Sequence, residues 1–172
     1  MKSFVCELKR KIRYETSCLN LALVFTVAAF CAVACIITAV SNFDGEAYEL
    51  LAVPRIAMPP FFIVFFWTVE TALFGAAVGI AVSIPSGTRE ASRRASALMF
   101  CVLAASYAWL PLFYSAQCFF IAALCAVCAL ILSAAVFSIC QRISKMAALF
   151  VLIYTAWLVY MVLLSFSFVF VA

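Results

Sequence analysis

The feature that most constrains the fold is a series of long apolar runs, which no water-soluble domain of this size could bury. A helix needs about 20 apolar residues to cross the hydrocarbon core of a bilayer, which is about 30 Å thick. The chain contains five runs of that order, at residues 18–40, 60–84, 95–114, 118–140 and 146–171. Backbone amides in a bilayer must be paired within the structure, and the runs lack the alternation of barrel strands, so they predict transmembrane helices.

Breaks between the runs support this division. Pro59-Pro60 opens the second run, and Pro85-Ser86-Gly87 ends it. Residues 95–140 would form a single helix of about 69 Å, so we expect the chain to reverse at Ser115-Ala116-Gln117. Composition agrees, because 70% of the residues are hydrophobic and 10% are charged, against roughly 25% charged in soluble domains. The sequence therefore predicts an all-α protein, a single five-helix transmembrane domain over residues 1–172.

The basic residues predict the orientation of this bundle. Ten of the eleven lysines and arginines lie in the N-terminal segment, in the connection after the second run or in the connection after the fourth. Arg55, in the long connection at residues 41–59, is the exception. Positive charge collects on the cytoplasmic side of membrane proteins, so we expect a cytoplasmic N-terminus. The basic N-terminal cluster serves this purpose, with contact to anionic lipid, and does not require nucleic-acid binding.

The start of the chain and its cysteines bear on location and chemistry. The first apolar run is longer than the core of a signal peptide, so we expect an uncleaved span in a multi-pass protein of the bacterial inner membrane. Most of the nine cysteines lie in apolar runs, and the chain has no histidine. Cys125 and Cys128 have CxxC spacing without a second pair. We therefore predict no metal site, no disulfide framework and no required cofactor.

Glu70 is an acidic residue that lies far from either end of its run. It lies ten residues after Pro60, or about 15 Å along a helix, close to the middle of the bilayer. Because a carboxylate is unfavourable there, we expect it to face the bundle interior or a cavity. Two interpretations stay open. Glu70 contacts a ligand or proton, or it is protonated and hydrogen-bonded to a hydroxyl such as that of Thr68 or Thr71.

The second run also carries an aromatic stripe. Trp67, Glu70, Thr71 and Phe74 follow i, i+3, i+4, i+7 spacing, which places them on one helix face. Such a face is either an aromatic binding wall with one polar group or simple packing.

Two pairs of small residues predict close helix contacts. Gly75 and Gly79 form a GxxxG pattern, and Ala104 and Ala108 form a weaker pair of the same spacing. Small residues let neighbouring helices approach closely, either within one bundle or between two copies. We therefore expect either pair to be able to support a homodimer.

Three motifs in chain order carry a resemblance to a known family. The first is Leu51-Ala-Val-Pro54-Arg-Ile56-Ala-Met58-Pro59 followed by Trp67-Thr68-Val-Glu70-Thr71-Ala-Leu73-Phe74-Gly75. The second is Ala105-Ser106-Tyr107-Ala108-Trp109-Leu110-Pro111-Leu112-Phe113-Tyr114, and the third is Ile153-Tyr154-Thr155-Ala156-Trp157 with Leu164-Ser165. Together they resemble the TspO/MBR family of tryptophan-rich sensory and translocator proteins, over about residues 51–168.

The chain departs from the family pattern at several positions. Ile56 stands in place of a tryptophan, Met58 of a proline and Thr71 of a tyrosine, and both Ser106 and Ser165 replace asparagines. Glu70 adds a carboxylate where leucine is usual. The family's cholesterol-recognition pattern needs a basic residue after its tyrosine, and none follows Tyr154 or Tyr160, so cholesterol binding is not carried over.

The resemblance implies a five-helix bundle, often dimeric, with a ligand pocket capped by the first loop. Family members are linked to tetrapyrroles such as protoporphyrin and haem, and some bacterial members to light-dependent porphyrin breakdown that involves tryptophans. Trp67 and Trp157 occupy the matching tryptophan positions here. We expect the wall of the pocket to be formed by Trp67, Thr71, Tyr107, Trp109, Tyr154 and Trp157, with Ser106 and Glu70 as polar contacts. The matching lid positions are Pro54, Ile56 and Pro59.

The leading hypothesis is thus a membrane-embedded binding protein, translocator or sensor for a tetrapyrrole or a similar flat hydrophobic ligand. A flat apolar macrocycle suits a cavity walled by aromatic rings. A small secondary transporter that uses Glu70 and a light-dependent porphyrin-degrading enzyme are the alternatives. No catalytic residue is assigned, and a purely structural membrane partner also fits the sequence.

Overall fold

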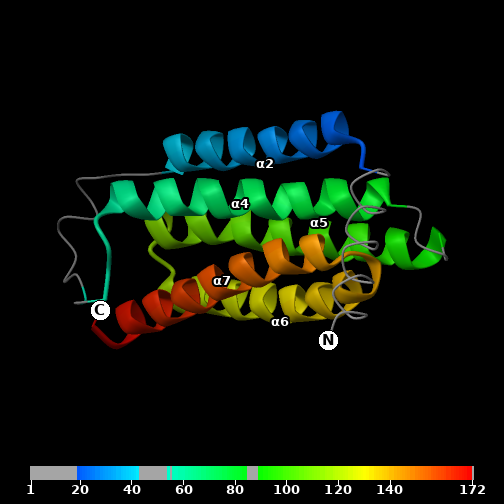
Figure 1. Ribbon diagram of the computed structural model, residues 1–172. Coiled ribbons are helices and arrows are strands. Elements are labelled where there is room, and N and C mark those ends of the chain that lie inside the picture. The colour runs from blue at the N-terminus through cyan, green and yellow to red at the C-terminus, as the bar shows by residue number, and fades with distance from the viewer. Residues whose placement is uncertain (1–18, 43–53, 55, 85–88, 172) are drawn as a thin grey trace, which may run out of the picture.

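The computed structural model describes residues 19–42, 54, 56–84 and 89–171. Five long helices account for almost all of them, as Figure 1 shows: α2 (Leu21–Asn42), α4 (Pro60–Ser83), α5 (Arg89–Leu110), α6 (Phe119–Ile143) and α7 (Lys145–Val171). All five are long and apolar enough to cross a membrane. The described ranges contain no strand. The predicted all-α membrane bundle is therefore confirmed, whereas its orientation stays a prediction.

Four of the helices surround the interior of the bundle. α6 packs extensively on both α5 and α7, and α4 closes the arrangement by packing on α7 and on α5. α2 lies along the outer side of α4, at one edge of the bundle in Figure 1, and reaches α5 with a few residues. An internal site in this bundle would therefore be enclosed by α4, α5, α6 and α7.

The GxxxG pair of α4 is used for packing within the chain. A Cβ atom added at Gly79 would lie 2.6 Å from the Cα of Val24, and one at Gly75 would lie 2.9 Å from the Sγ of Cys31. Both neighbours are on α2, so the absence of side chains at the two glycines is what lets α2 approach α4 so closely. Ala104 and Ala108 on α5 are exposed, and this face stays available for a predicted homodimer.

The helix α5 begins earlier than its apolar run. It starts at Arg89, whereas the apolar run begins at Ala95. Glu90 and Arg94 form an ion pair on the exposed surface of this first part. Pairs of opposite charge four residues apart support a helix without adding hydrophobicity, so a search for apolar runs does not find these residues.

The reversal between α5 and α6 is built by a proline. Pro111 has no amide hydrogen to donate to the preceding turn, and residues Pro111–Ser115 form a π-helical turn, η1. The amide of Ala116 donates to the carbonyl oxygen of Pro111 at 2.9 Å. Gln117 then adopts a left-handed conformation with φ of 50°. The chain therefore turns back at the polar break where the sequence predicts it.

Candidate functional site

Buried aromatic side chains gather between α4, α5 and α7. The rings of Trp67 and Trp109 meet edge to face with centroids 6.1 Å apart, and the rings of Trp67 and Tyr107 lie 6.2 Å apart. Phe113 stacks on Trp109 at 4.5 Å and meets Phe168 of α7 at 5.0 Å. Trp67 and Trp109 are only 1% and 2% exposed. The predicted residues of α4 and α5 thus form one aromatic cluster in the bundle interior.

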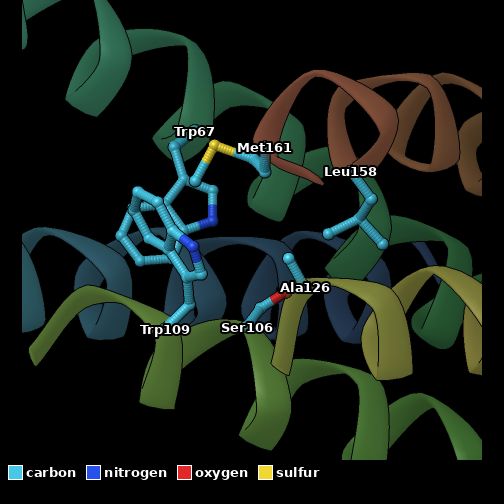
Figure 2. A pocket seen from close by; sticks show the side chains of 6 residues that line it. All are labelled: Trp67, Ser106, Trp109, Ala126, Leu158 and Met161. Atoms are coloured by element: carbon cyan, nitrogen blue, oxygen red, sulfur yellow. The ribbon is translucent and has the colours of Figure 1, made fainter. Parts of the chain in front are cut away.

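A small cavity adjoins this cluster. Its volume is about 10 Å³, and it is lined by Trp67, Ser106, Trp109, Ala126, Leu158 and Met161. Figure 2 shows the two indole rings side by side, with the sulfur of Met161 next to them and Leu158, Ala126 and Ser106 beyond. These residues come from α4, α5, α6 and α7. Such a volume is close to the minimum that holds one water molecule, so side chains fill the interior of the site in this structure.

Hydrogen bonds between helices fix the polar groups around the cavity. The hydroxyl groups of Ser106 on α5 and Tyr154 on α7 lie 2.5 Å apart. The Nε1 of Trp109 donates to the Oγ of Ser165 at 2.8 Å. The Tyr107 hydroxyl donates to the carbonyl oxygen of Cys31 on α2 at 2.9 Å. These polar groups therefore have partners within the protein, and they hold α5 against α7 and α2.

The threonine of the aromatic stripe makes a local bond. The hydroxyl of Thr71 is buried and donates to the carbonyl oxygen of Trp67, one turn earlier in α4, at 2.6 Å. The hydroxyl of Thr68 donates to the carbonyl oxygen of Val64 at 2.8 Å. Neither hydroxyl is bonded to Glu70, so the structure does not contain the Glu70–threonine hydrogen bond that the sequence left open.

Glu70 and Trp157 lie away from the cavity, where α4 meets α7. Phe66 of α4 contacts Trp157 of α7 with ring centroids 6.2 Å apart, and Phe74 contacts Tyr154 at 4.4 Å. Glu70 lies between Phe66 and Phe74 along α4, so its side chain falls at the level between these two contacts. The Oε2 of Glu70 and the Nε1 of Trp157 are buried and have no hydrogen-bond partner among the described residues. We call this region, formed by Phe66, Glu70 and Trp157, the α4–α7 seam.

The segment at residues 56–58, just before α4, is hydrogen-bonded to α7 through Tyr160. The amide of Met58 donates to the Tyr160 hydroxyl at 3.2 Å, and that hydroxyl donates to the carbonyl oxygen of Ile56 at 3.4 Å. The ring of Tyr160 also contacts Trp157 at 5.1 Å. Of the predicted lid residues, Pro54 is half-buried, and Ile56 and Pro59 are exposed. Most of the predicted lid, residues 43–53 and 55, lies outside the described residues.

Several residues of the site were not predicted from the sequence. Ala126, Leu158 and Met161 line the cavity, but nothing distinguishes them from the other apolar residues of α6 and α7. Tyr160 had a usable signal, because it follows Trp157 by three residues and therefore lies on nearly the same helix face. Within the described ranges, no group of three or more histidine, cysteine or acidic residues could hold a metal ion.

Comparison with known proteins adds an independent observation. No curated protein sequence matches the chain. A family model described as the TspO/MBR family matches residues 22–171, which extend from the first turn of α2 to the end of α7. A match of this extent supports a general role in binding or translocating sterols or tetrapyrroles at a membrane. Because the model matches most of the sequence and all five described helices, the chain belongs to the TspO/MBR family.

Proposed function

We propose that the protein binds a tetrapyrrole, or a similarly flat hydrophobic ligand, between α4, α5 and α7 within the bacterial inner membrane. The aromatic cluster of Trp67, Tyr107 and Trp109 beside the cavity carries this proposal. Aromatic rings offer flat apolar surfaces against which a macrocycle stacks. The hydroxyl groups of Ser106 and Tyr154 supply polar contacts at the same place.

The site is closed in this structure and has to open before a ligand can enter. A pocket for a ligand of drug size has a volume of about 300–1,000 Å³, whereas the present cavity measures about 10 Å³. Hydrogen bonds that involve Trp109 and Ser106 join α5 to α7, but α7 meets α4 through ring contacts. Ring contacts can slide without leaving a hydrogen bond broken, so we propose that α4 and α7 separate to admit the ligand.

The short segment at residues 56–58 acts as the lid in this proposal. Its two hydrogen bonds to the Tyr160 hydroxyl fasten it to α7, the helix that supplies Leu158 and Met161 to the cavity. Movement of α7 away from α4 would therefore also strain or release the segment. We therefore propose that the segment at residues 56–58 opens in the same motion that separates α7 from α4.

A titration of protoporphyrin into the purified protein in nanodiscs tests the proposal. We expect saturable quenching of tryptophan fluorescence. Ala126→Leu places a larger side chain in the cavity and should weaken binding by about tenfold or more, the scale of a small steric misfit of 1–3 kcal/mol. Ala134→Leu is the matched control, because Ala134 is exposed on the same helix, and it should bind as the parent does.

A second variant keeps this test decisive if Ala126→Leu folds poorly. Met161→Ala enlarges the cavity and should bind protoporphyrin as tightly as the parent or more tightly, with faster association. Quenching that never saturates, or equal binding by the Ala126→Leu and Ala134→Leu variants, would contradict the proposal. New porphyrin products under illumination would instead favour the light-dependent degrading enzyme.

One observation favours a second candidate, a small secondary transporter. Glu70 is a carboxylate within a membrane-spanning helix, and its Oε2 has no partner among the described residues. Carboxylates in such positions commonly mark proton or substrate pathways. Flux measured in liposomes would separate the two candidates, because Glu70→Gln should abolish proton-coupled transport and leave protoporphyrin binding unchanged.

A further inference from the structure

Glu70 lies at a depth where few natural partners can reach it. It is ten residues from Pro60, the first residue of α4, or about 15 Å along the helix axis, near the middle of a core about 30 Å thick. The charged headgroups of phospholipids remain at the bilayer surface, about half the core thickness away. A partner for the carboxylate must therefore come from the protein itself or from a molecule soluble in hydrocarbon.

The described part of the protein supplies no such partner. The basic side chains whose placement the structure describes are Arg93, Arg94, Arg142 and Lys145, all exposed. They lie near the start of α5 and at the junction of α6 and α7, far along the helices from Glu70. Arg94 is already paired with Glu90. The Oε2 of Glu70 is buried without a hydrogen bond among the described residues, and a buried polar atom without a partner is unfavourable.

Aromatic rings of α4 and α7 lie close to Glu70 along the helices. Phe66, one turn before Glu70, is 40% exposed, so part of its ring faces lipid. The ring of Phe62 stacks on Phe66 at 6.4 Å, and the ring of Trp157 lies against Phe66 from α7. Trp157 is 9% exposed, and its Nε1 also lacks a partner among the described residues. The seam thus combines one acidic group that has an unpaired oxygen with aromatic surface that is free to contact a ligand.

We propose that the α4–α7 seam binds a lipophilic cation that enters from the bilayer. The faces of aromatic rings attract cations, most strongly where water is excluded, and Glu70 supplies the opposite charge. A hydrophobic amine or a delocalised organic cation can reach this depth, because its charge is carried inside an apolar body. The positive charge of the ligand lies beside the Oε2 of Glu70, and its apolar body covers the exposed ring of Phe66.

The site is separate from the cavity proposed for tetrapyrroles and goes beyond that function. None of the residues of the α4–α7 seam lines the cavity. Their chemistry also differs, since the carboxylate arms of a porphyrin would be repelled by Glu70, whereas the hydroxyl groups of Ser106 and Tyr154 carry no charge. The two sites can therefore be tested independently in one set of variants.

Two probes of the same shape and opposite charge test the proposal. Tetraphenylphosphonium is a lipophilic cation, and tetraphenylborate is the matching anion. The protein would be placed in nanodiscs of neutral phosphatidylcholine, and binding of each probe would be measured by equilibrium dialysis against empty nanodiscs. We expect saturable binding of tetraphenylphosphonium with one site per chain and no saturable binding of tetraphenylborate.

Substitutions in the α4–α7 seam test whether tetraphenylphosphonium binds there. Glu70→Gln should weaken tetraphenylphosphonium binding by roughly tenfold to a hundredfold, the usual contribution of a contact to a charged group. Glu70→Asp keeps the charge and should retain part of the affinity. Phe66→Leu should lose a few fold, because it removes one aromatic face. Glu90→Gln is the control, since Glu90 is exposed and paired with Arg94, and it should change nothing.

The outcomes separate this proposal from the proposed function. Protoporphyrin quenching should be the same for Glu70→Gln and the parent, and circular dichroism checks that the variant is folded. Equal binding of the two probes, no saturable binding of the cation, or a Glu70→Gln variant that binds the cation as the parent does would each overturn the inference. Loss of protoporphyrin binding alone would contradict only the tetrapyrrole site.

Discussion

The indole Nε1 of Trp109 donates a hydrogen bond of 2.8 Å to the hydroxyl of Ser165, and both side chains are buried. The same hydroxyl donates to the carbonyl oxygen of Met161, one turn earlier in α7, at 2.8 Å. Ser165 therefore links the aromatic cluster of α5 to the backbone of α7. In the family pattern this position is an asparagine, so the short serine performs the linkage with a single oxygen that accepts one bond and donates another.

The Ser165→Ala variant should be less stable than the parent. It leaves the Nε1 of Trp109 buried without an acceptor, which is unfavourable by about 1–3 kcal/mol. Thermal unfolding in nanodiscs, followed by circular dichroism, measures the change. Ser138→Ala is the control, because Ser138 is exposed and bonds only to its own helix. Equal midpoints for the two variants would show that the Trp109–Ser165 bond does not stabilise the bundle.

The two glycines of α4 should tolerate alanine differently. At Gly79 the new methyl group meets the Cα of Val24 at 2.6 Å, whereas at Gly75 its nearest atom is the side-chain sulfur of Cys31 at 2.9 Å. Backbone cannot move as easily as a side chain, so we expect Gly79→Ala to destabilise by about 1–3 kcal/mol and Gly75→Ala by less. Thermal unfolding of the two variants measures this order. The reverse order would contradict the described packing of α2 on α4.

The Tyr160→Phe variant should release the segment at residues 56–58. It removes the acceptor of the Met58 amide and the donor to the carbonyl oxygen of Ile56. Hydrogen exchange measured by mass spectrometry should become faster in peptides that contain Met58. Tyr107→Phe removes a hydroxyl bonded to Cys31 on α2 instead, and it should leave this exchange unchanged. If opening of the segment limits entry, Tyr160→Phe should also speed protoporphyrin association.

A homodimer through Ala104 and Ala108 can be tested by cysteine crosslinking. Cys101 is exposed and precedes Ala104 by three residues, so it lies on the same face of α5. Oxidation in membranes should give a disulfide-linked dimer that Cys101→Ala abolishes and that the Cys118→Ala and Cys128→Ala variants retain. Ala104→Trp should also abolish it, because close approach requires small side chains. A crosslink that survives Cys101→Ala would place the dimer interface elsewhere.

The fold could be predicted from the sequence because membrane-spanning helices impose a strong and simple pattern. A run of apolar residues of sufficient length has few structural solutions in a bilayer, and the breaks at Pro85-Ser86-Gly87 and at Ser115-Ala116-Gln117 divide the runs. The first residues of α5 were not predicted to be helical, because the segment Arg89–Arg94 is mostly polar. An apolar run locates the part of a helix that lies within the bilayer. The helix itself can continue into the polar residues on either side of that run.

The site could be predicted only in part. The motifs pointed to Trp67, Ser106 and Trp109, which line the cavity together. They also pointed to Glu70 and Trp157, which the structure places on the seam between α4 and α7. The face of a helix that meets a given neighbour depends on how all five helices pack, and almost uniformly apolar helices such as α7 carry little sequence signal for that choice. The GxxxG pair illustrates the same limit, because its spacing predicts close approach without naming α2 as the partner.

The most direct test of the central claim is a structure of the protein with protoporphyrin bound in a lipid environment. We predict that the macrocycle lies between α4, α5 and α7 against Trp67 and Trp109. We also predict that the contact of these two rings, now 6.1 Å between centroids, is altered and that α7 has moved away from α4. A macrocycle bound on the outer surface of the bundle, with the Trp67–Trp109 contact unchanged, would contradict this claim.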